Sequence, residues 1–300
     1  MTTLQPRLVA LDLDGTLLDP QGRVAPRSAA AISALSAAGV RIVLATGRSP
    51  WSVRPIALQL GLGGDHIMMQ GGLVGSAVRD TTRWSAPMSA PLVLEHLAFA
   101  REHDLEPILG HREGYWAERL APDVLALSWP TYDEGSHMAL VPDLERIAGD
   151  GVIRTFLFTS PARHATIRRS ARARFGDRTS ITWGDEFGIE LLAPGVSKGA
   201  ALARLAAGLG LSMDTVAAAG DGRNDLEMLA LAGRSAAMAA ARPEVQKAAQ
   251  RVVPSNADDG ALVALLEWFP WLGDEPGVLT GAPLPGVGKD TGSRPAESAA

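Results

Sequence analysis

The chain has 300 residues, a net charge of −5 and no cysteine, with 46% hydrophobic and 20% charged residues. This composition is typical of a soluble globular protein of one large domain or two ordinary ones. The lack of cysteine excludes disulfides, thiolate zinc sites and cysteine nucleophiles. The chain lacks the clustered basic surface of nucleic-acid binders, a secretory signal and a run of ~20 apolar residues. We therefore expect a cytoplasmic protein with no nucleic-acid or membrane partner.

The N-terminal part of the chain alternates short apolar runs with helix-length segments. The runs predict strands at 8–11, 41–46 and 66–70, and helices at 28–39 and 50–61 lie between them. Continuously apolar strands separated by helices are typical of a parallel sheet covered on both faces.

The same alternation returns after residue 188. Strands are predicted at 215–221, 235–239 and 251–255, and helices at 198–210, 224–233, 243–250 and 258–269. The sequence therefore predicts an α/β fold, a Rossmann-like doubly wound parallel sheet formed by residues 1–82 and 188–271.

The intervening residues 83–187 have a different pattern. Two helices are predicted at 91–104 and 162–175, among short strands at 105–110, 114–118, 152–159, 179–183 and 187–192. This predicts an α+β cap domain inserted into the α/β domain. Residues 272–300 are rich in glycine, proline and small polar residues, which predicts a disordered tail.

The first predicted strand ends in two aspartates, Asp12 and Asp14, in the sequence DLDGT. If the strand continued to Asp14, both side chains would point the same way, and at ~4 Å they would repel by about 4 kcal/mol. A plain turn is the alternative. A calcium-binding EF-hand loop is excluded, because it needs glycine at 17 and glutamate at 23, where the chain has Leu17 and Arg23.

Two further segments carry polar groups at the ligand-binding edge of the predicted sheet. In ATGR, the Thr46 hydroxyl and the backbone around Gly47 suit a phosphate oxygen, although Thr46 could instead cap the next helix. In GVSKG, Lys198 stands at a helix start, where the dipole disfavours a cation. It is either a solvated surface residue or directed at an anion.

The fourth segment, GDGRND, follows the strand at 215–221. Asp221, Asn224 and Asp225 lie within five residues, more than helix capping requires. Together, Asp12, Asp14 and Asp221 form a set of hard oxygen ligands without nitrogen or sulfur partners, which favours Mg²⁺. A metal, carboxylates, a lysine and a hydroxyl donor are what phosphoryl transfer needs.

These four segments resemble, in order and spacing, the four motifs of the haloacid dehalogenase (HAD) superfamily of phosphatases. The insertion is similar to the cap of its Cof-type subgroup, and the resemblance covers residues 6–270. It implies a Mg²⁺-dependent phosphatase of small phosphorylated metabolites, with sugar phosphates as the first guess. It also implies an aspartyl-phosphate intermediate and a monomer or small homo-oligomer.

The resemblance also implies a role for each matching residue. Asp12 would be the nucleophile, and Asp14 the acid and base. The Mg²⁺ ligands would be the Asp12 carboxylate, the Asp14 backbone carbonyl and the Asp221 carboxylate, with Asp225 supporting the metal or the lysine. The residues that bind the phosphorylated substrate would be Thr46, Gly47, Arg48, Lys198 and Asn224, and Thr46 and Lys198 would also take part in catalysis.

The segment after the third predicted core strand departs from the family pattern, which has Asn-Gly there. Here Gln70 precedes Gly71, so a substrate contact at this point is open. The motifs also leave alternatives in function. A phosphomutase would use the same intermediate, and a non-catalytic phospho-ligand-binding module would not need Asp14.

Overall fold

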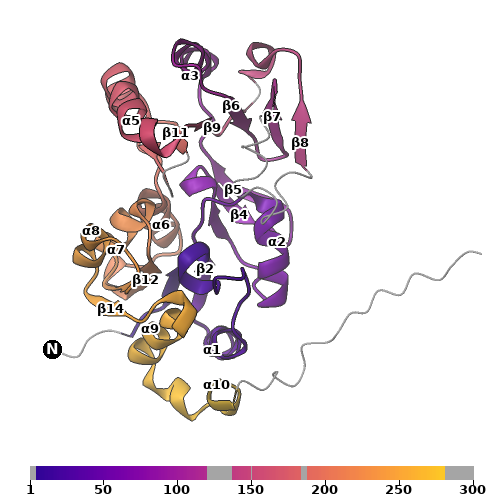
Figure 1. Cartoon of the computed structure of the whole chain (residues 1–300). Coiled ribbons are helices and arrows are strands. Elements are labelled where there is room, and N and C mark those ends of the chain that lie inside the picture. The colour runs from indigo at the N-terminus through magenta and orange to yellow at the C-terminus, as the bar shows by residue number, and fades with distance from the viewer. Residues whose placement is uncertain (1–4, 120–136, 150, 184–187, 281–300) are drawn as a thin grey trace, which may run out of the picture.

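The computed structural model describes residues 5–119, 137–149, 151–183 and 188–280. The described chain forms two bodies, a core and a cap. In Figure 1 the core, with its parallel sheet, lies below the cap.

The core is built around a parallel sheet with strand order β14–β13–β12–β1–β2. The strands are β1 (Leu8–Leu11), β2 (Arg41–Leu44), β12 (Val216–Gly220), β13 (Arg234–Met238) and β14 (Arg251–Val253). A parallel bridge between Ala45 and Ile67 extends the sheet beyond β2. Chain order reverses between β1 and β12, and open α/β sheets bind their ligands at such switch points.

Alternate side chains of the core strands enter two separate apolar layers. Val9 and Leu11 pack in the layer formed with α1 (Pro26–Ala37), α2 (Pro50–Gln59) and α9 (Gly260–Trp268). Leu8 and Ala10 pack in the layer formed with α6 (Lys198–Gly208), α7 (Leu226–Leu231) and α8 (Pro243–Ala248). Because the strands are buried on both faces, the structure confirms the doubly wound α/β fold.

A small antiparallel sheet connects the core to the cap. It contains β3 (His66–Met68), β4 (Leu73–Ser76) and β5 (Thr81–Ser85). The third core strand was predicted to run to Gln70, but it ends at Met68, because Met69 and Gln70 have φ of 50° and 59° and turn the chain.

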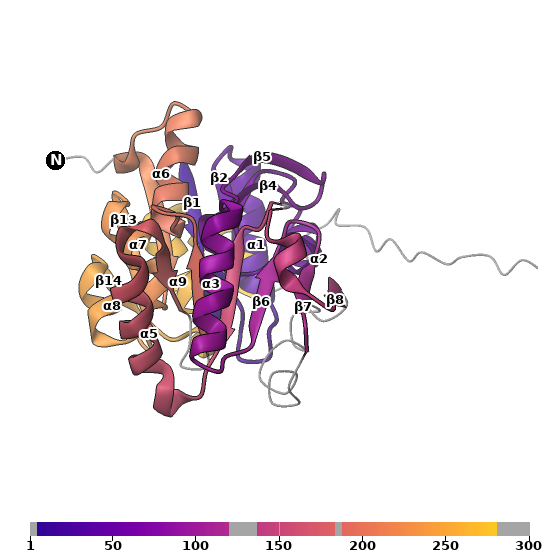
Figure 2. The ribbon, with the colours of Figure 1, turned by 90° about the horizontal axis from the view of Figure 1, so that it is seen from above.

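The cap is a mixed sheet with strand order β10–β11–β9–β6–β7–β8. Its strands are β6 (Pro107–Gly110), β7 (Tyr115–Ala117), β8 (Met138–Leu140), β9 (Arg154–Phe158), β10 (Ser180–Thr182) and β11 (Gly188–Leu192). Helices α3 (Ala90–Glu102) and α5 (Pro161–Phe175) cover its outer face, and both lie in front of the rest of the molecule in Figure 2, which is seen from above. Strand β11 lies on the core side of the predicted boundary at 187/188 but pairs within the cap sheet.

The C-terminal segment corrects one prediction. Composition predicted a disordered tail from residue 272, but a 3₁₀ turn (Pro270–Asp274) and α10 (Pro276–Thr280) continue the fold there. Leu272 and Val278 are buried, and the Arg27 Nε donates to the Val278 carbonyl at 2.7 Å. The high glycine and proline content of this segment gave no sign that these two side chains would be buried. The rest of the predicted tail, 281–300, lies outside the described residues.

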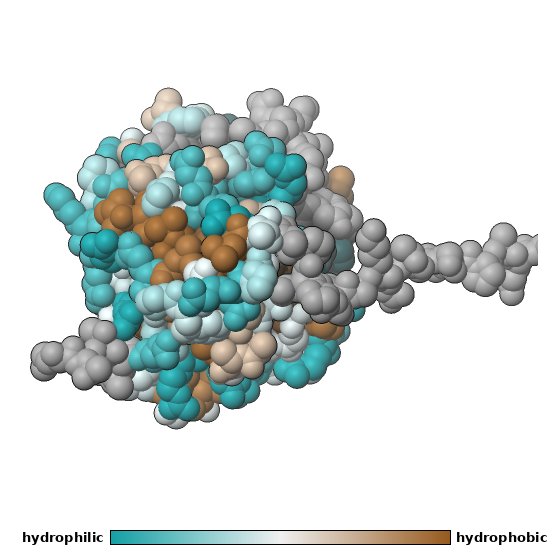
Figure 3. Space-filling view, turned by 90° about the horizontal axis from the view of Figure 1, so that it is seen from below, coloured by the Kyte–Doolittle hydropathy of each residue, from teal (hydrophilic) through white to brown (hydrophobic). Residues whose placement is uncertain are grey.

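The underside of the molecule, where Figure 1 places α9 and α10, shows apolar residues gathered among polar ones (Figure 3). Leu279 is 60% exposed. Among the helices that the structure describes, none has both the length and the apolarity required to span a bilayer.

Candidate active site

The site is assembled where β1, β2 and β12 end and α6 begins. The Lys198 ammonium donates to Asp12 Oδ1 and to Asp225 Oδ1, both at 2.7 Å. Asp12 directly follows β1, and Asp225 lies in the loop after β12. The three side chains, which lie far apart in sequence, therefore form one buried ionic cluster at the switch point of the sheet.

The two aspartates of the first motif separate in the structure. Strand β1 ends at Leu11, so the condition for their side chains to converge is not met. The Asp14 carboxylate instead accepts from Arg48, with Nε at 2.8 Å and Nη2 at 2.5 Å, and its side chain is 40% exposed. Asp12 is buried on Lys198. The pair thus consists of one buried and one accessible carboxylate.

Gly15 allows the turn that separates them. Its φ is 79°, and a Cβ at this position would lie 2.4 Å from Asp221 Oδ2. Glycine therefore both permits the left-handed backbone and lets the loop approach Asp221. Thr16 then donates its hydroxyl to Asp221 Oδ1 at 2.9 Å.

Burial decides the alternatives for Lys198. The side chain is 1% exposed, so it is directed at anions and is not a solvated surface residue. Burial alone would lower its pKa, but the charges of Asp12 and Asp225 outweigh it and hold the pKa above the usual range for lysine. The ammonium therefore stays charged at neutral pH.

The carboxylates have the opposite shift. Burial, reinforced by the nearby Asp225 charge, raises the pKa of Asp12 well above its usual range, and Lys198 opposes this shift. Burial and Asp225 also raise the pKa of Asp221 to about 6. The cluster contains three carboxylates and one ammonium, which bonds two of them, so the carboxylates outnumber the cation.

Oxygens of Asp12, Asp221 and Asp225 all lie within 4.8 Å of one another, close enough to hold a metal ion. An all-oxygen donor set with an excess of negative charge suits Mg²⁺. Asp225 also accepts from the backbone N–H groups of Asp221 and Gly222, at 3.0 and 2.8 Å, and so fixes the loop. The Asp14 side chain is outside this cluster, and the metal ligand implied there, its backbone carbonyl, stays a prediction.

The second motif, residues 45–48, follows β2. With Gln70 and Asn224, it forms what we call the substrate-binding wall of the site. Thr46 is 1% exposed, and its Oγ1 accepts from the Arg48 N–H at 3.1 Å. The N-cap of α2 is Ser49, so Thr46 is not the helix cap that the sequence left open. Gly47 is in contact with Gln70, because a Cβ at Gly47 would lie 2.5 Å from Gln70 Nε2.

Residues from the cap also reach this wall, and the sequence prediction missed them. Arg154 on β9 donates to the Gly47 carbonyl at 2.7 Å, and Glu190 on β11 accepts from Gln70 Nε2 at 2.7 Å. The sequence signal was present, since each is the one charged residue of its strand. Asn224 also joins the wall, donating to Gln70 Oε1 at 3.0 Å.

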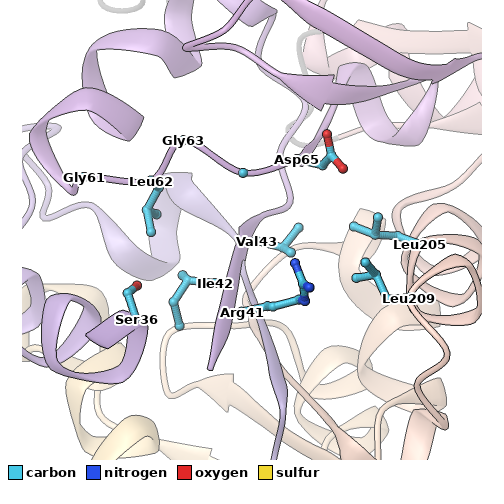
Figure 4. Close-up of a pocket in the computed structure, with 11 residues that line it drawn as sticks. Ser36, Arg41, Ile42, Val43, Gly61, Leu62, Gly63, Asp65, Leu205 and Leu209 are labelled. Carbon is cyan, nitrogen blue, oxygen red and sulfur yellow. The ribbon is translucent and has the colours of Figure 1, made fainter. Parts of the chain in front are cut away.

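Among the described residues, hollows adjoin the core sheet at two different edges. One, of about 240 Å³, is lined by Lys198, Asn224 and Arg223 from the core and by Ser180 and Thr182 from the cap. The other, of about 200 Å³, lies beside the amino end of β2, between the 61–65 loop and α6 (Figure 4). The first adjoins the ionic cluster, whereas the second lies at the opposite edge of the sheet.

Comparisons with known proteins identify the family of the chain. The family model for haloacid dehalogenase-like hydrolases matches residues 9–265. The chain is 30% identical over 240 residues to the HMP-PP phosphatase of Serratia proteamaculans, covering 80% of this chain and 86% of that protein. It is 27% identical over 275 residues to the pyridoxal phosphate phosphatase YbhA of Escherichia coli, covering 86% and 96%.

Solved structures show the same fold. A sugar phosphatase of HAD subclass IIB superposes with a TM-score of 0.75 at 20% identity, covering 88% of this chain and 99% of that one. The motif resemblance is thereby confirmed, and this chain belongs to the haloacid dehalogenase-like hydrolases.

Proposed function

We propose that the protein is a Mg²⁺-dependent phosphatase that hydrolyses small phosphorylated metabolites through an aspartyl-phosphate on Asp12. The observation that carries the proposal is the buried Asp12 carboxylate, held by Lys198 at 2.7 Å beside the two further carboxylates of Asp221 and Asp225. A nucleophile, a fixed cation and a metal-binding acidic cluster thus meet at one strand end.

The reaction has two halves. An Asp12 carboxylate oxygen attacks phosphorus, the bond from phosphorus to the leaving oxygen breaks, and Asp14 gives that oxygen its proton. Water then attacks the aspartyl-phosphate, Asp14 takes a proton from the water, and the bond between Asp12 and phosphorus breaks. Inorganic phosphate leaves, and both side chains return to their starting state.

The other residues bind and orient the substrate. Lys198 offsets the charge of the nucleophile and of the phosphoryl group, and the Thr46 hydroxyl with the backbone N–H of Gly47 binds phosphoryl oxygens. The Arg48 N–H holds the Thr46 hydroxyl oxygen in place. Arg48 also holds the Asp14 carboxylate in place.

Asp12 and Asp221 would hold Mg²⁺, together with the Asp14 backbone carbonyl, and Asp225 would support the metal ligands and Lys198. When bound, the ion neutralises charge that develops on the phosphoryl oxygens. The donor set fits the ion, because the cluster offers only carboxylate oxygens and has an excess of negative charge.

The substrate class follows from the site and the relatives. The hollow of about 240 Å³ has walls from both core and cap, so it can hold the alcohol part of a small phosphate ester. Sugar phosphates are the first candidates, followed by pyridoxal phosphate and HMP-PP, which the names of relatives specify. Cytoplasmic location and a monomeric or small homo-oligomeric state stay predictions of the sequence.

Hydrolysis of a panel of phosphate esters with Mg²⁺ tests the proposal, with Asp12→Asn as the matched variant. We expect turnover by the wild type, loss of turnover in the variant, and loss on addition of EDTA. No turnover on any ester, or equal turnover by Asp12→Asn, would contradict it. Transfer of the phosphoryl group to a second hydroxyl without release of phosphate would identify a phosphomutase.

A further inference from the structure

A series of buried and partly buried hydrogen bonds joins the cap to the core residues that are implied in substrate binding. From the core side, Asn224 bonds Gln70, and Gln70 bonds Glu190. Glu190 Oε2 accepts from Arg154 Nη1 at 2.6 Å, and the same nitrogen donates to the Gly47 carbonyl at 2.7 Å. Both ends of this series of contacts therefore lie on residues implied in substrate binding, and between them stand Gln70 of the core and Glu190 and Arg154 of the cap.

Arg154 and Glu190 share one face of the cap sheet. Glu190 pairs with Phe156 in the β9–β11 ladder, and Arg154 lies two residues before Phe156, so the two charged side chains are diagonal neighbours. Their side chains are 8% and 7% exposed. Desolvation makes a buried ion pair costly, so a gain in stability does not by itself explain why the cap contains this one. Its contacts with the core suggest a different role.

Arg154 is itself anchored within the cap. Its Nη2 donates to the Tyr115 hydroxyl, and Tyr115 is 1% exposed. The Tyr115 ring packs edge-on against Trp51 of the core helix α2, with ring centroids 5.4 Å apart. The guanidinium is thus aimed at the Gly47 carbonyl by a buried hydroxyl and a buried carboxylate.

Gln70 is set in one orientation by its two partners. Its carbonyl oxygen accepts from Asn224 and its amide nitrogen donates to Glu190. The residue has φ of 59°, and its backbone N–H donates to the Thr46 carbonyl at 3.1 Å. Gln70, which stands where the family pattern has asparagine, therefore contacts Asn224 of the core and Glu190 of the cap with one side chain.

We propose that Arg154 and Glu190 are positioning residues that the cap supplies to the catalytic site. Arg154 fixes the Gly47 carbonyl, and with it the peptide unit whose N–H, that of Arg48, donates to the Thr46 hydroxyl oxygen. Glu190 fixes Gln70 and, through it, Asn224. The substrate-binding wall then has its working geometry only while the cap is seated on the core. This inference rests on the proposed phosphatase function and adds two residues to it.

We expect substitutions of Arg154 and Glu190 to lower kcat and to change KM little. Displacement of binding groups by about 1 Å costs on the order of 100-fold in rate. We expect Arg154→Met and Glu190→Gln to lower kcat by about 10- to 100-fold, with KM changed less than about threefold. Arg154→Lys, which keeps the charge and one donor, should recover part of the loss. Gln70→Leu breaks the same series of contacts from the core side and leaves the ion pair intact.

The experiment measures hydrolysis of p-nitrophenyl phosphate with Mg²⁺ and amide deuterium exchange on the full chain. Ile167→Ala is the matched control, because Ile167 is buried in the cap on α5, away from the series of contacts. It lowers cap stability without touching Gly47 or Gln70. All variants are assayed at a temperature where thermal unfolding shows them folded.

The expected result is a fall in kcat in Arg154→Met, Glu190→Gln and Gln70→Leu, with faster exchange in peptides covering 45–49 and 69–72. Rates and exchange within about twofold of Ile167→Ala would overturn the inference. Wild-type protein inactive on every ester would refute the proposed function instead. The exchange of these two segments would still decide whether the cap residues hold them.

Discussion

The core and the cap both bury charged side chains, but they balance them differently. In the core, Asp12 and Asp225 share the ammonium of Lys198, and a third carboxylate, Asp221, lies beside them. In the cap, Arg154 and Glu190 form a one-to-one pair. An unbalanced buried cluster calls for a cation, whereas a balanced pair needs no further ion.

The two regions also differ in where the charges lie. The core places them at strand ends, where loops can turn side chains toward a ligand. The cap places its pair within strands β9 and β11, where the pleat fixes the direction of each side chain. We infer that the charged groups of the core take part in the chemistry, whereas Arg154 and Glu190 of the cap hold other residues in position.

Lys198→Met removes the cation that is paired with two carboxylates of the core cluster. It leaves Asp12 and Asp225 buried without their cation, so we expect hydrolysis to fall about 10³-fold or more. Metal-free protein should lose about 3–5 kcal/mol of unfolding free energy, the usual cost of removing one partner of a buried pair. Steady-state kinetics and urea unfolding measure the two effects. The exposed Lys247→Met serves as control, and retention of a tenth of the activity would contradict the role of Lys198.

Gly71→Ala tests how closely the core packs behind the site. Gly71 has φ of 94°, and an added Cβ would lie 2.2 Å from the Ser197 carbonyl oxygen, next to Lys198. We expect a loss of about 3 kcal/mol or more, because backbone must shift. At Gly61, with φ of 68° and open space around it, alanine should cost only about 1 kcal/mol. Equal melting temperatures for the two variants would show that the approach at Gly71 is not limiting.

The strands of the core could be predicted from the sequence, whereas the contacts between the core and the cap could not. Continuous apolar strands and glycine-flanked aspartates are local signals, and β1, β2 and β12 lie where they predicted. Asp12 and Asp225 lie together because the parallel strands β1 and β12 bring their carboxyl ends to one edge, and Lys198 reaches both from the start of α6.

The contact between Gln70 and Glu190 could not be predicted in the same way. The two residues are 120 positions apart, and their meeting depends on how the cap sheet sits on the core. The split between Asp12 and Asp14 also required the structure, since it follows from the end of β1 and the φ of Gly15. The order of residues 272–280 depends on two buried side chains that average composition does not reveal.

His96 gives the cap a pH dependence that the acidic cluster does not share. It is buried on α3 between the hydroxyls of Thr155 and Thr179, and burial, helped by the Arg178 charge, lowers its pKa to about 3. In the unfolded chain the imidazole takes up a proton near pH 6.5. Because the unfolded state then binds more protons, stability falls as pH drops from about 6.5 toward 3.

For His96 alone this amounts to about 2 kcal/mol of unfolding free energy between pH 7 and pH 5. His96→Gln should remove that share of the pH dependence, although the variant starts from a lower stability at pH 7. Urea unfolding at the two pH values measures it. A variant with the wild-type difference between pH 7 and pH 5 would show that His96 takes up its proton in the folded cap as well.

The smallest expected effect concerns the C-terminal end of the described core. Val278 is 1% exposed in the layer that contains α1, and its neighbour Leu279 is 60% exposed. Val278→Ala removes two buried methyl groups, about 1.5 kcal/mol at 0.8 kcal/mol per methylene-sized group. Leu279→Ala should change the urea midpoint little, because its side chain already contacts solvent. Equal midpoints for the two variants would mean that α10 does not contribute to the core, while a shift in Val278→Ala alone makes α10 part of the domain.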